Sequence, residues 1–416
     1  MNKIKTIIYS VLVLVIVLFA FAFLPGLQGV DAAWYSSGGV WTNRKVIAVD
    51  YQKVPGAQTN FPMLFSVIDS HLKSTGNGGL VGQTDGGDIL FTWDNGATKL
   101  SHEIEKYDAT TGELVAWVNI PYLSSTSTTY LHIYYGDDDV ANQADTADGS
   151  NDVWDSNFKG VWHLKEDPST TCATTKEICD STSNAVNGDA NGSMNSGDQV
   201  AGQIGGSIEF DASDDYIDFS AISVTDHTIS GWFYFNTDTY NWTSMVGAFS
   251  ATVANDADYG FDLKNTGTLR LWKTDNLIVA NSTLLLKKRG WVYIVGSYDQ
   301  DDGSTNDCGF FYFDGVLDST SCSSTSITST HSFKINKNWD GSNWPGKMDE
   351  IRISSTPRSA TWIRTEYNNQ SSPGTFYSYS GQEQENKTVT SGKVRGGGTT
   401  NLTQPSVKAR GGVKFR

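Results

Sequence analysis

The feature that most constrains this chain is a series of short runs in which large apolar residues alternate with polar ones. Successive side chains of a strand point to opposite faces of a sheet, so such runs predict strands with one buried face. Clusters of Gly, Asn and Asp, which favour turns, separate the runs. The pattern therefore predicts an all-β protein. The clearest runs are Lys45–Asp50, Met63–Val67, Leu114–Ile120, Tyr130–Tyr135, Thr228–Phe235 and Trp291–Tyr298.

The length of 416 residues allows two or three domains of ordinary size. Aromatic residues make up 12 % of the chain, which excludes a mostly disordered protein because disordered chains have few large side chains to bury. We expect two β-sandwich modules, one at residues 34–136 and one at 158–381. Residues 137–157 are acidic and poor in aliphatic side chains, so we expect a linker there.

The N-terminal residues 1–33 have the pattern of an export signal. Lys3 and Lys5 precede an apolar run at 7–24, and small residues around Ala32 resemble a signal-peptidase site. A run of this length is also near the minimum for a membrane span, so an uncleaved anchor is the alternative. In both cases we expect the rest of the chain to be extracellular or at the cell surface. We expect contact with the membrane only through residues 7–24, and only if this segment stays uncleaved.

The four cysteines fit an oxidising compartment, where an even number suggests disulfides. Cys172 lies close to Cys179 in the sequence, and Cys308 lies close to Cys322. The turn signal Asp314-Gly315 predicts a hairpin, and a three-residue loop at 314–316 would place Cys308 opposite Cys322. We expect a cross-strand disulfide there and a second one between Cys172 and Cys179.

The net charge of −16 argues against a nucleic-acid partner, because neutralising phosphates requires a basic surface. The acidic character belongs to the body, since the chain has six basic residues and no acid from Ser391 onward. Residues 382–416 are rich in Gly and Thr and contain two similar segments, Lys393–Gly397 and Lys408–Gly412. We expect a flexible tail that contacts an anionic cell-envelope polymer or the edge strand of a partner, or that is simply a solvated linker.

The first module resembles a known family. Its segments, from Trp41–Ile47 to Tyr130–Gly136, are similar to the DUF2341 family, an extracellular β module of unknown function. The resemblance covers roughly residues 41–136 and implies no mechanism. The other matching segments are Asn60–Leu64, Asp85–Phe91, Leu100–Glu105 and Ala116–Pro121.

Several segments of the second module, from Gly160–Leu164 to Trp362–Asn368, resemble a laminin-G-like jelly roll of the concanavalin A-like lectin/glucanase superfamily. This resemblance implies two antiparallel sheets packed face to face, which the strand alternation also predicts. Between these two segments lie Ser207–Asp211, Asp215–Phe219, Thr228–Phe235, Trp291–Tyr298 and Gly346–Ile353.

Because the superfamily includes glucanases, paired carboxylates are the first candidates for catalytic residues. Glu103 and Glu105 share a strand face, which we interpret as a solvated face rather than a catalytic pair. The run Glu209-Phe-Asp211-Ala-Ser-Asp214 only partly matches the superfamily's glucanase motif. His163, in an apolar strand, is interpreted as a structural histidine. We therefore expect a protein that is not an enzyme.

The laminin-G-like resemblance implies a structural calcium ion between an early Asp-containing loop and the closing strand. The corresponding residues are Asp180 and Asp349, although the early loop is a loose match to the family. Calcium prefers several hard oxygen ligands, which loops at the ends of strands can supply. The alternative is that Asp180 caps a turn and Asp349 accepts backbone hydrogen bonds.

Tryptophans outside the alternating runs are the candidates for ligand binding, because packing does not obviously account for them. Trp339 and Trp344 lie in the loop Asn338–Pro345 beside Asp340, and Trp242 is a weaker candidate. Sugar rings stack on exposed aromatic rings, while acidic and amide side chains bind their hydroxyl groups. The alternative is that the loop tryptophans simply cover an end of the sandwich.

The sequence therefore predicts an exported, cell-surface binding or adhesion protein whose second module recognises a polysaccharide or glycoprotein. One alternative is a structural component of the envelope or of an appendage, without sugar specificity. A minor alternative is an extracellular glycan-degrading enzyme.

Overall fold

The computed structural model describes residues 33–145, 150–173, 175–237, 242–250, 257–273, 277–286, 290–300, 307–323, 331–337 and 343–385. The predicted signal or anchor, most of the predicted tail, and the candidates Trp339 and Asp340 lie outside these residues. Of the helices that these residues form, none is long and apolar enough to cross a membrane.

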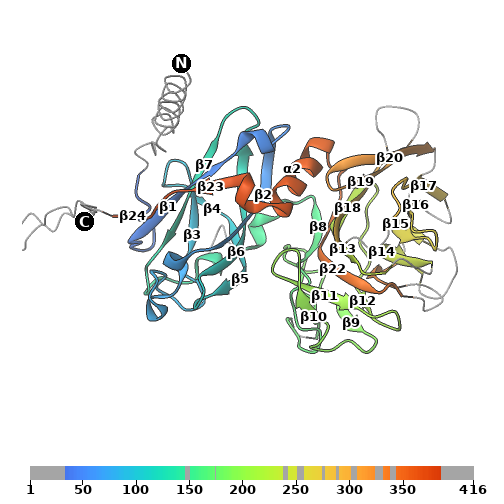
Figure 1. Cartoon of the computed structure of the whole chain (residues 1–416), viewed down its shortest axis with the longest axis horizontal. Helices are drawn as coiled ribbons and strands as arrows, with labels where there is room; N and C mark the ends of the chain where they lie inside the picture. Colours follow the sequence, from blue (N-terminus) through green and yellow to red (C-terminus); the bar gives the residue numbers. More distant parts are fainter. Residues whose placement is uncertain are drawn as a thin grey trace, which may run out of the picture.

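The first module is built from two antiparallel sheets around one apolar core (Figure 1). Over the described residues its larger sheet has the strand order β23-β1-β7-β3-β4, with β24 also paired to β1. The smaller sheet has the order β2-β6-β5. The strands are β1 (Asn43–Val49), β2 (Gln58–Ile68), β3 (Leu90–Trp93), β4 (Lys99–Leu100), β5 (His102–Asp108), β6 (Glu113–Leu123), β7 (Thr129–Tyr135), β23 (Tyr377–Tyr379) and β24 (Glu383–Gln384).

The second module is a larger sandwich of two antiparallel sheets. One sheet has the order β10-β11-β22-β13-β18-β19-β20, with β8 also paired to β22, and consists of β8 (Phe158–Trp162), β10 (Gln199–Ala201), β11 (Gly206–Phe210), β13 (His227–Phe235), β18 (Gly290–Asp299), β19 (Asp307–Phe313), β20 (Val316–Ser323) and β22 (Gly346–Ser354). The other has the order β17-β16-β15-β14-β21-β12-β9 and consists of β9 (Asp189–Asn191), β12 (Tyr216–Asp218), β14 (Thr243–Phe249), β15 (Ala257–Leu263), β16 (Leu269–Lys273), β17 (Leu277–Asn281) and β21 (Phe333–Ile335).

Alternation places the core of the second module between its two sheets. In β15 the side chains of Tyr259, Phe261 and Leu263 are all buried in this core. The intervening Asp258 and Asp262 belong to the opposite face of the sheet, as expected for a period of two residues. The prediction of an all-β protein with two sandwich modules is therefore confirmed.

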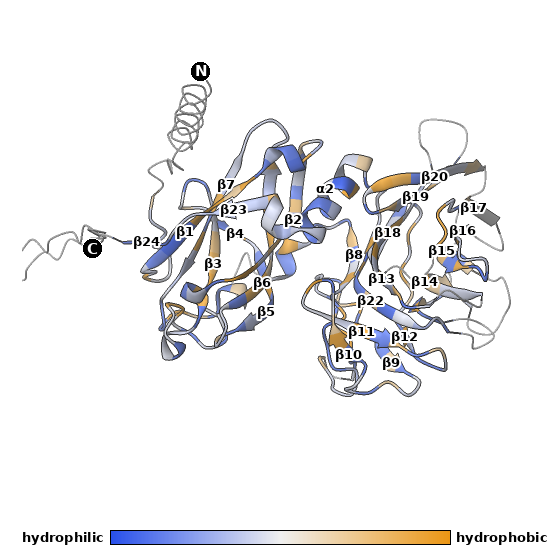
Figure 2. Ribbon diagram, in the orientation of Figure 1, coloured by the Kyte–Doolittle hydropathy of each residue, from blue (hydrophilic) through white to orange (hydrophobic). Residues whose placement is uncertain are grey.

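The helix α2 (Ala360–Ser371) lies between the two modules (Figure 1). It begins at the N-cap Ser359, whose hydroxyl accepts the N–H of Trp362 at 3.1 Å. Although α2 is largely hydrophilic (Figure 2), both polar and apolar side chains on it are buried, so it packs partly through hydrogen bonds. The short helix α3 (Pro373–Phe376) and β23 follow, and β23 joins the first module's sheet.

After the second module, the chain therefore returns to the first module. Residues 377–379 and 383–384 pair with β1, although the sequence placed them in the second module and the tail. The expected linker at 137–157 also contributes buried side chains, because Val153 and Trp154 pack in the core that includes the first module.

Both expected disulfides are present, one joining Cys172 to Cys179 and one joining Cys308 to Cys322. The three-residue loop predicted for the hairpin of Cys308 and Cys322 is wrong. Phe313 pairs with Val316 across a two-residue turn at 314–315. A bulge between Phe311 and Tyr312 then shifts the register by one residue, so that Cys308 still faces Cys322.

Candidate functional site

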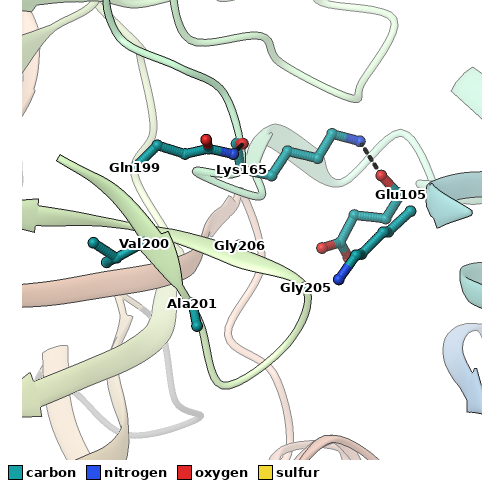
Figure 3. Close-up of a pocket in the computed structure, with 8 residues that line it drawn as sticks. Glu105, Lys165, Gln199, Val200, Ala201, Gly205 and Gly206 are labelled. Carbon is teal, nitrogen blue, oxygen red and sulfur yellow. Dashed lines mark hydrogen bonds between the residues drawn. The ribbon is translucent and has the colours of Figure 1, made fainter. Parts of the chain in front are cut away.

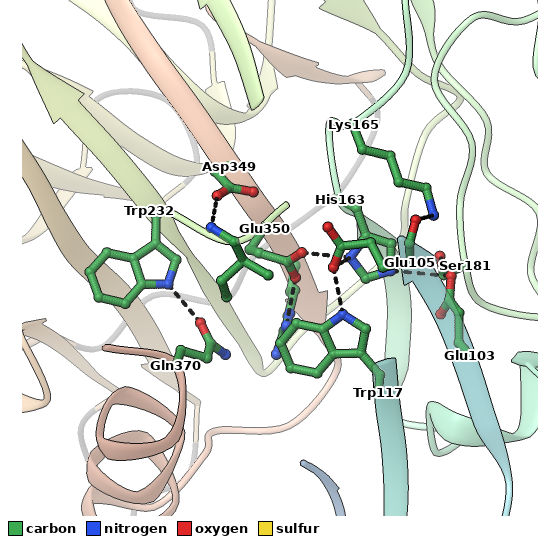
Figure 4. A network of polar contacts seen from close by, with 12 residues as sticks. Glu103, Glu105, Trp117, His163, Lys165, Ser181, Trp232, Asp349, Glu350 and Gln370 are labelled. Carbon is green, nitrogen blue, oxygen red and sulfur yellow. Dashed lines mark hydrogen bonds and ion pairs between the residues drawn. The ribbon is translucent and has the colours of Figure 1, made fainter. Parts of the chain in front are cut away.

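A cluster of buried charged side chains lies where the two modules meet (Figure 4). At its centre is His163, which directly follows β8 and is only 1 % exposed. His163 Nδ1 lies 2.6 Å from Oε1 of Glu350 in β22, and its Nε2 lies 3.2 Å from Oε1 of Glu103 in β5. One imidazole therefore connects a strand of each module. We use the name interface cluster for Glu103, Glu105, His163, Asp349, Glu350 and Arg352.

Glu103 is bound by further donors. Its Oε1 accepts the hydroxyl of Ser181 at 2.7 Å, and its Oε2 accepts the indole N–H of Trp154 at 3.0 Å. Each carboxylate oxygen thus has at least one partner. The expectation that Glu103 and Glu105 share a face is consistent with their common neighbour, His163, but the expectation that this face is solvated is wrong, since both residues are buried.

Only one of the two carboxylate oxygens of Glu105 has a hydrogen-bond partner. Its Oε2 accepts the indole N–H of Trp117 at 2.9 Å and lies 3.6 Å from Nδ1 of His163. Its Oε1 is buried and has no hydrogen-bond partner. Figure 4 shows Glu105 directed toward His163 from the first module.

Arg352 in β22 extends the network to α2. Its guanidinium donates to Oε2 of Glu350 at 2.6 Å and to Oε1 of Glu366 at 2.7 Å. The guanidinium carbon also lies 4.3 Å from the ring centroid of Trp117 and 4.9 Å from that of Trp154. Such cation–π contacts with desolvated rings are favourable, so Arg352 links three segments at once.

The backbone at Glu350 interrupts the alternation of β22. Glu350 has a φ of 56°, and the pairing of β22 with β13 shifts register between Ser230 and Trp232. In a regular strand, Asp349 and Glu350 would point to opposite faces. Both carboxylates are instead buried close enough to influence each other. Oδ2 of Asp349 accepts the N–H of Ile204 at 2.9 Å, while its Oδ1 has no partner.

The buried charges of the interface cluster shift the pKa values of its groups in different directions. Burial lowers the pKa of His163, but the carboxylates around it, Glu350 first, outweigh burial and raise this pKa well above 6.5. Burial raises the pKa of Glu103, but His163, together with Lys165 and the hydroxyl of Ser181, outweighs burial and lowers this pKa to about 2. Burial and Glu350 raise the pKa of Glu105 to about 7, and they also raise the pKa of Asp349 well above 3.8.

A pocket of about 440 Å³ adjoins the cluster between β5 and the β10–β11 hairpin (Figure 3). Glu105, Lys165 and Gln199 are among its polar lining residues. The loop at Gly205 approaches Glu105 so closely that a Cβ there would lie 2.0 Å from Oε1 of Glu105. Glu105 is thus the member of the cluster that borders a pocket.

A second candidate lies on the face of β14–β16 that points away from the module's core. There the guanidinium carbon of Arg270 lies 4.4 Å from the ring centroid of Trp242 and 4.3 Å from that of Trp272. Asp262, on the neighbouring strand, accepts two hydrogen bonds from Arg270. Trp242 is 41 % exposed, so part of its ring is open to a ligand. We call these four residues the Trp242 face.

The structure places none of the other predicted ligand residues on a described surface. Trp344 is only 1 % exposed and packs against Phe233 and Phe235, so its predicted role as an exposed platform is wrong. Trp339 and Asp340 lie outside the described residues and stay predictions. Sequence reasoning missed Arg270 and Trp272, although their two-residue spacing in an alternating strand places them on one face.

The predicted calcium ligands have protein partners. Asp180 accepts backbone N–H groups from Val161, Thr182 and Val186, which is the turn-capping alternative. Asp349 belongs to the interface cluster. In the described part of the chain, the acidic and histidine groups spaced closely enough for a metal are Glu105 with His163 and Glu350, and Asp211 with Asp214 and Asp215. Calcium at Asp180 and Asp349 therefore stays a prediction.

Comparison with protein families yields two matches. Residues 85–163 match the family described as Domain of unknown function (DUF2341), and residues 211–364 match the Concanavalin A-like lectin/glucanases superfamily. The chain carries a DUF2341 region followed by a concanavalin A-like domain. This order confirms the resemblance seen in the sequence. The DUF2341 match extends to His163, so it spans Glu103, Glu105 and the strand that brings His163 to them.

Solved structures similar to the chain align with about half of it. Domain 4 of AbnA, a GH43 extracellular arabinanase from Geobacillus stearothermophilus, in complex with arabinotriose, is 18 % identical with a TM-score of 0.37, covering 50 % of this chain and 98 % of that one. The binding domain of Paraclostridial Mosquitocidal Protein 1 is 13 % identical with a TM-score of 0.38, covering 51 % and 52 %. The chain thus spans about half the length of the latter. Comparison with curated proteins found no match.

Proposed function

We propose that the protein is exported and binds a polysaccharide or the glycan of a glycoprotein at the cell surface, through its concanavalin A-like domain. The observation that carries this proposal is the Trp242 face, where an exposed indole is oriented by a guanidinium that is itself bound by a carboxylate.

The chemistry of the Trp242 face suits a sugar. The flat ring of Trp242 offers a surface on which the C–H face of a pyranose or furanose can stack. Arg270 and Asp262 supply donor and acceptor groups beside that ring, and their mutual hydrogen bond fixes their geometry before a ligand arrives. An apolar surface with a few oriented polar groups is typical of binding sites for small ligands.

Export is the second element of the proposal. The two disulfides are of the kind that persists in oxidising compartments, and the apolar run at 7–24 after Lys3 and Lys5 supplies an export signal or an anchor. The proposal includes no catalytic step. Both oxygens of Glu103 already accept hydrogen bonds, so this carboxylate does not resemble a free nucleophile for a sugar.

The test is a glycan array probed with the purified full chain, followed by affinity measurements on the best ligand. Trp242→Ala should weaken binding at least about tenfold, because it removes the stacking surface. Tyr122→Ala is the matched control, since Tyr122 is also an exposed aromatic, 52 % exposed, but lies on β6 of the first module. Its affinity should equal that of the parent protein.

Two results would contradict the proposal. Equal affinity in the parent and in Trp242→Ala would exclude the Trp242 face as the binding surface. No binding to any glycan would instead favour a structural component of the envelope or of an appendage.

A further inference from the structure

We propose that Glu105, His163 and Glu350 bind a divalent transition-metal ion, zinc or manganese, at the contact between the two modules. This site is separate from the Trp242 face and does not depend on the glycan proposal.

The candidate ligand atoms lie close together. One carboxylate oxygen from each glutamate and one ring nitrogen of His163 all lie within 4.8 Å of one another. His163 Nδ1 is the shared neighbour, 2.6 Å from Oε1 of Glu350 and 3.6 Å from Oε2 of Glu105. Ligand bonds to zinc are about 2.0–2.2 Å long, so neighbouring ligand atoms in a tetrahedral site are roughly 3.3–3.6 Å apart. Small side-chain rotations would bring the three atoms to that spacing.

The histidine is oriented as metal-binding histidines usually are. Its other nitrogen, Nε2, faces Oε1 of Glu103, which is held in place by Ser181 and by the indole of Trp154. A metal-bound imidazole commonly donates its second N–H to a carboxylate, which fixes the tautomer that presents the other nitrogen to the metal. Glu103 is suited to that supporting role.

An independent observation comes from oxygen atoms without partners. Oε1 of Glu105 and Oδ1 of Asp349 are buried and accept no hydrogen bond, on side chains that are more than nine-tenths buried. The interface cluster also has more acids than bases, with four carboxyl groups against His163 and Arg352. Buried carboxylates normally need a compensating positive charge. A divalent cation among these oxygens would supply it.

The proposed site lies beside a pocket. Glu105 lines the pocket at the β10–β11 hairpin, although its side chain is itself buried, so the ion would be held just beneath the pocket wall. Lys165, at the same pocket, donates to the backbone carbonyl of Glu105 at 3.1 Å rather than to its carboxylate. The mixed nitrogen and oxygen ligands favour zinc or manganese over calcium, which takes six to eight oxygens.

The test uses the purified full chain, stripped with EDTA and titrated with ZnCl2, MnCl2 or CaCl2 by calorimetry, with bound metal counted by mass spectrometry. We expect one zinc or manganese ion per chain and at least tenfold weaker calcium binding. Glu105→Gln, which keeps the side chain's shape, should weaken binding at least tenfold. Asp214→Asn is the control, because it alters the other, exposed acidic group and should leave the affinity unchanged.

A second measurement needs no variant at the site. In protein loaded with Co2+, a ring-proton NMR signal of one histidine should be strongly shifted by the paramagnetic ion, and His163 should be that residue. The proposal is overturned if no transition metal binds, if the shifted histidine is not His163, or if folded Glu105→Gln binds as tightly as the parent.

Discussion

At the scale of single residues, Trp344 lies in the core and Trp242 lies at the surface. Replacing Trp344 should therefore cost much more stability than replacing Trp242. Trp344 is buried against Phe233 and Phe235, so Trp344→Ala would leave a large cavity. We expect a loss of about 3–5 kcal/mol in the free energy of unfolding, measured by urea titration, with unchanged glycan affinity in the folded fraction. Trp242→Ala should lose less than about 1 kcal/mol. Equal losses in the two variants would contradict this assignment.

The sequence could not distinguish these two tryptophans. Both lie outside alternating runs, where exposure is the simplest expectation. The backbone of Trp344 is instead bound by the side chain of Asn336, which accepts its N–H at 2.8 Å and donates to its carbonyl at 3.1 Å. Side-chain to backbone bonds of this kind leave no periodic pattern in the sequence, so the burial of Trp344 was not predictable.

At the scale of elements, the β19–β20 hairpin and its disulfide should be tested together. Removing the bridge with Cys308→Ser and Cys322→Ser should cost about 3 kcal/mol, because the unfolded chain regains the freedom of a loop with a sequence separation of 14 residues. The matched pair Cys172→Ser and Cys179→Ser, with a separation of 7, should cost slightly less, about 2.5 kcal/mol. Urea titrations would measure both losses. A negligible loss for Cys308 and Cys322 would show that the hairpin is constrained without the bridge.

The same hairpin shows how far local patterns extend. Alternation and the Asp-Gly signal correctly predicted two strands and the cysteine pair. The bulge at Phe311 and Tyr312 was not predictable, because a bulge depends on how a strand fits its neighbours rather than on its own sequence. The same applies to the bulge at Glu350 in β22, which brings Asp349 and Glu350 into one cluster.

At the scale of the whole molecule, the two modules share a core. The apolar cluster of the first module includes Trp232 and Tyr293 from the second module and Trp362 from α2. Sequence patterns predicted two separate sandwiches joined by a linker, because each pattern reports only on its own strand. Glu103 and His163 are 60 residues apart, and Leu64 and Asn369 are 305 apart, so neither contact has a local signal.

Side chains of α2 and β23 cover the open edge of β2 in the first module. This arrangement predicts how the protein unfolds. β2 is an edge strand, with backbone groups that β6 does not pair. The side chain of Asn369 accepts the N–H of Leu64 at 2.7 Å and donates to its carbonyl at 3.0 Å. The hydroxyl of Tyr377 bonds in the same way to the N–H and carbonyl of Ser66, two residues along the edge.

Asn369→Ala would leave the N–H and the carbonyl of Leu64 buried without partners, which should cost about 3 kcal/mol. In scanning calorimetry the parent protein should unfold in one cooperative transition, because α2 and the shared core join the modules, and the variant should melt at a lower temperature. Asn265→Ala, in an exposed turn between β15 and β16, is the control and should change the free energy of unfolding by less than about 0.5 kcal/mol. Two separate transitions in the parent, or an unchanged melting temperature in Asn369→Ala, would mean that α2 does not couple the modules.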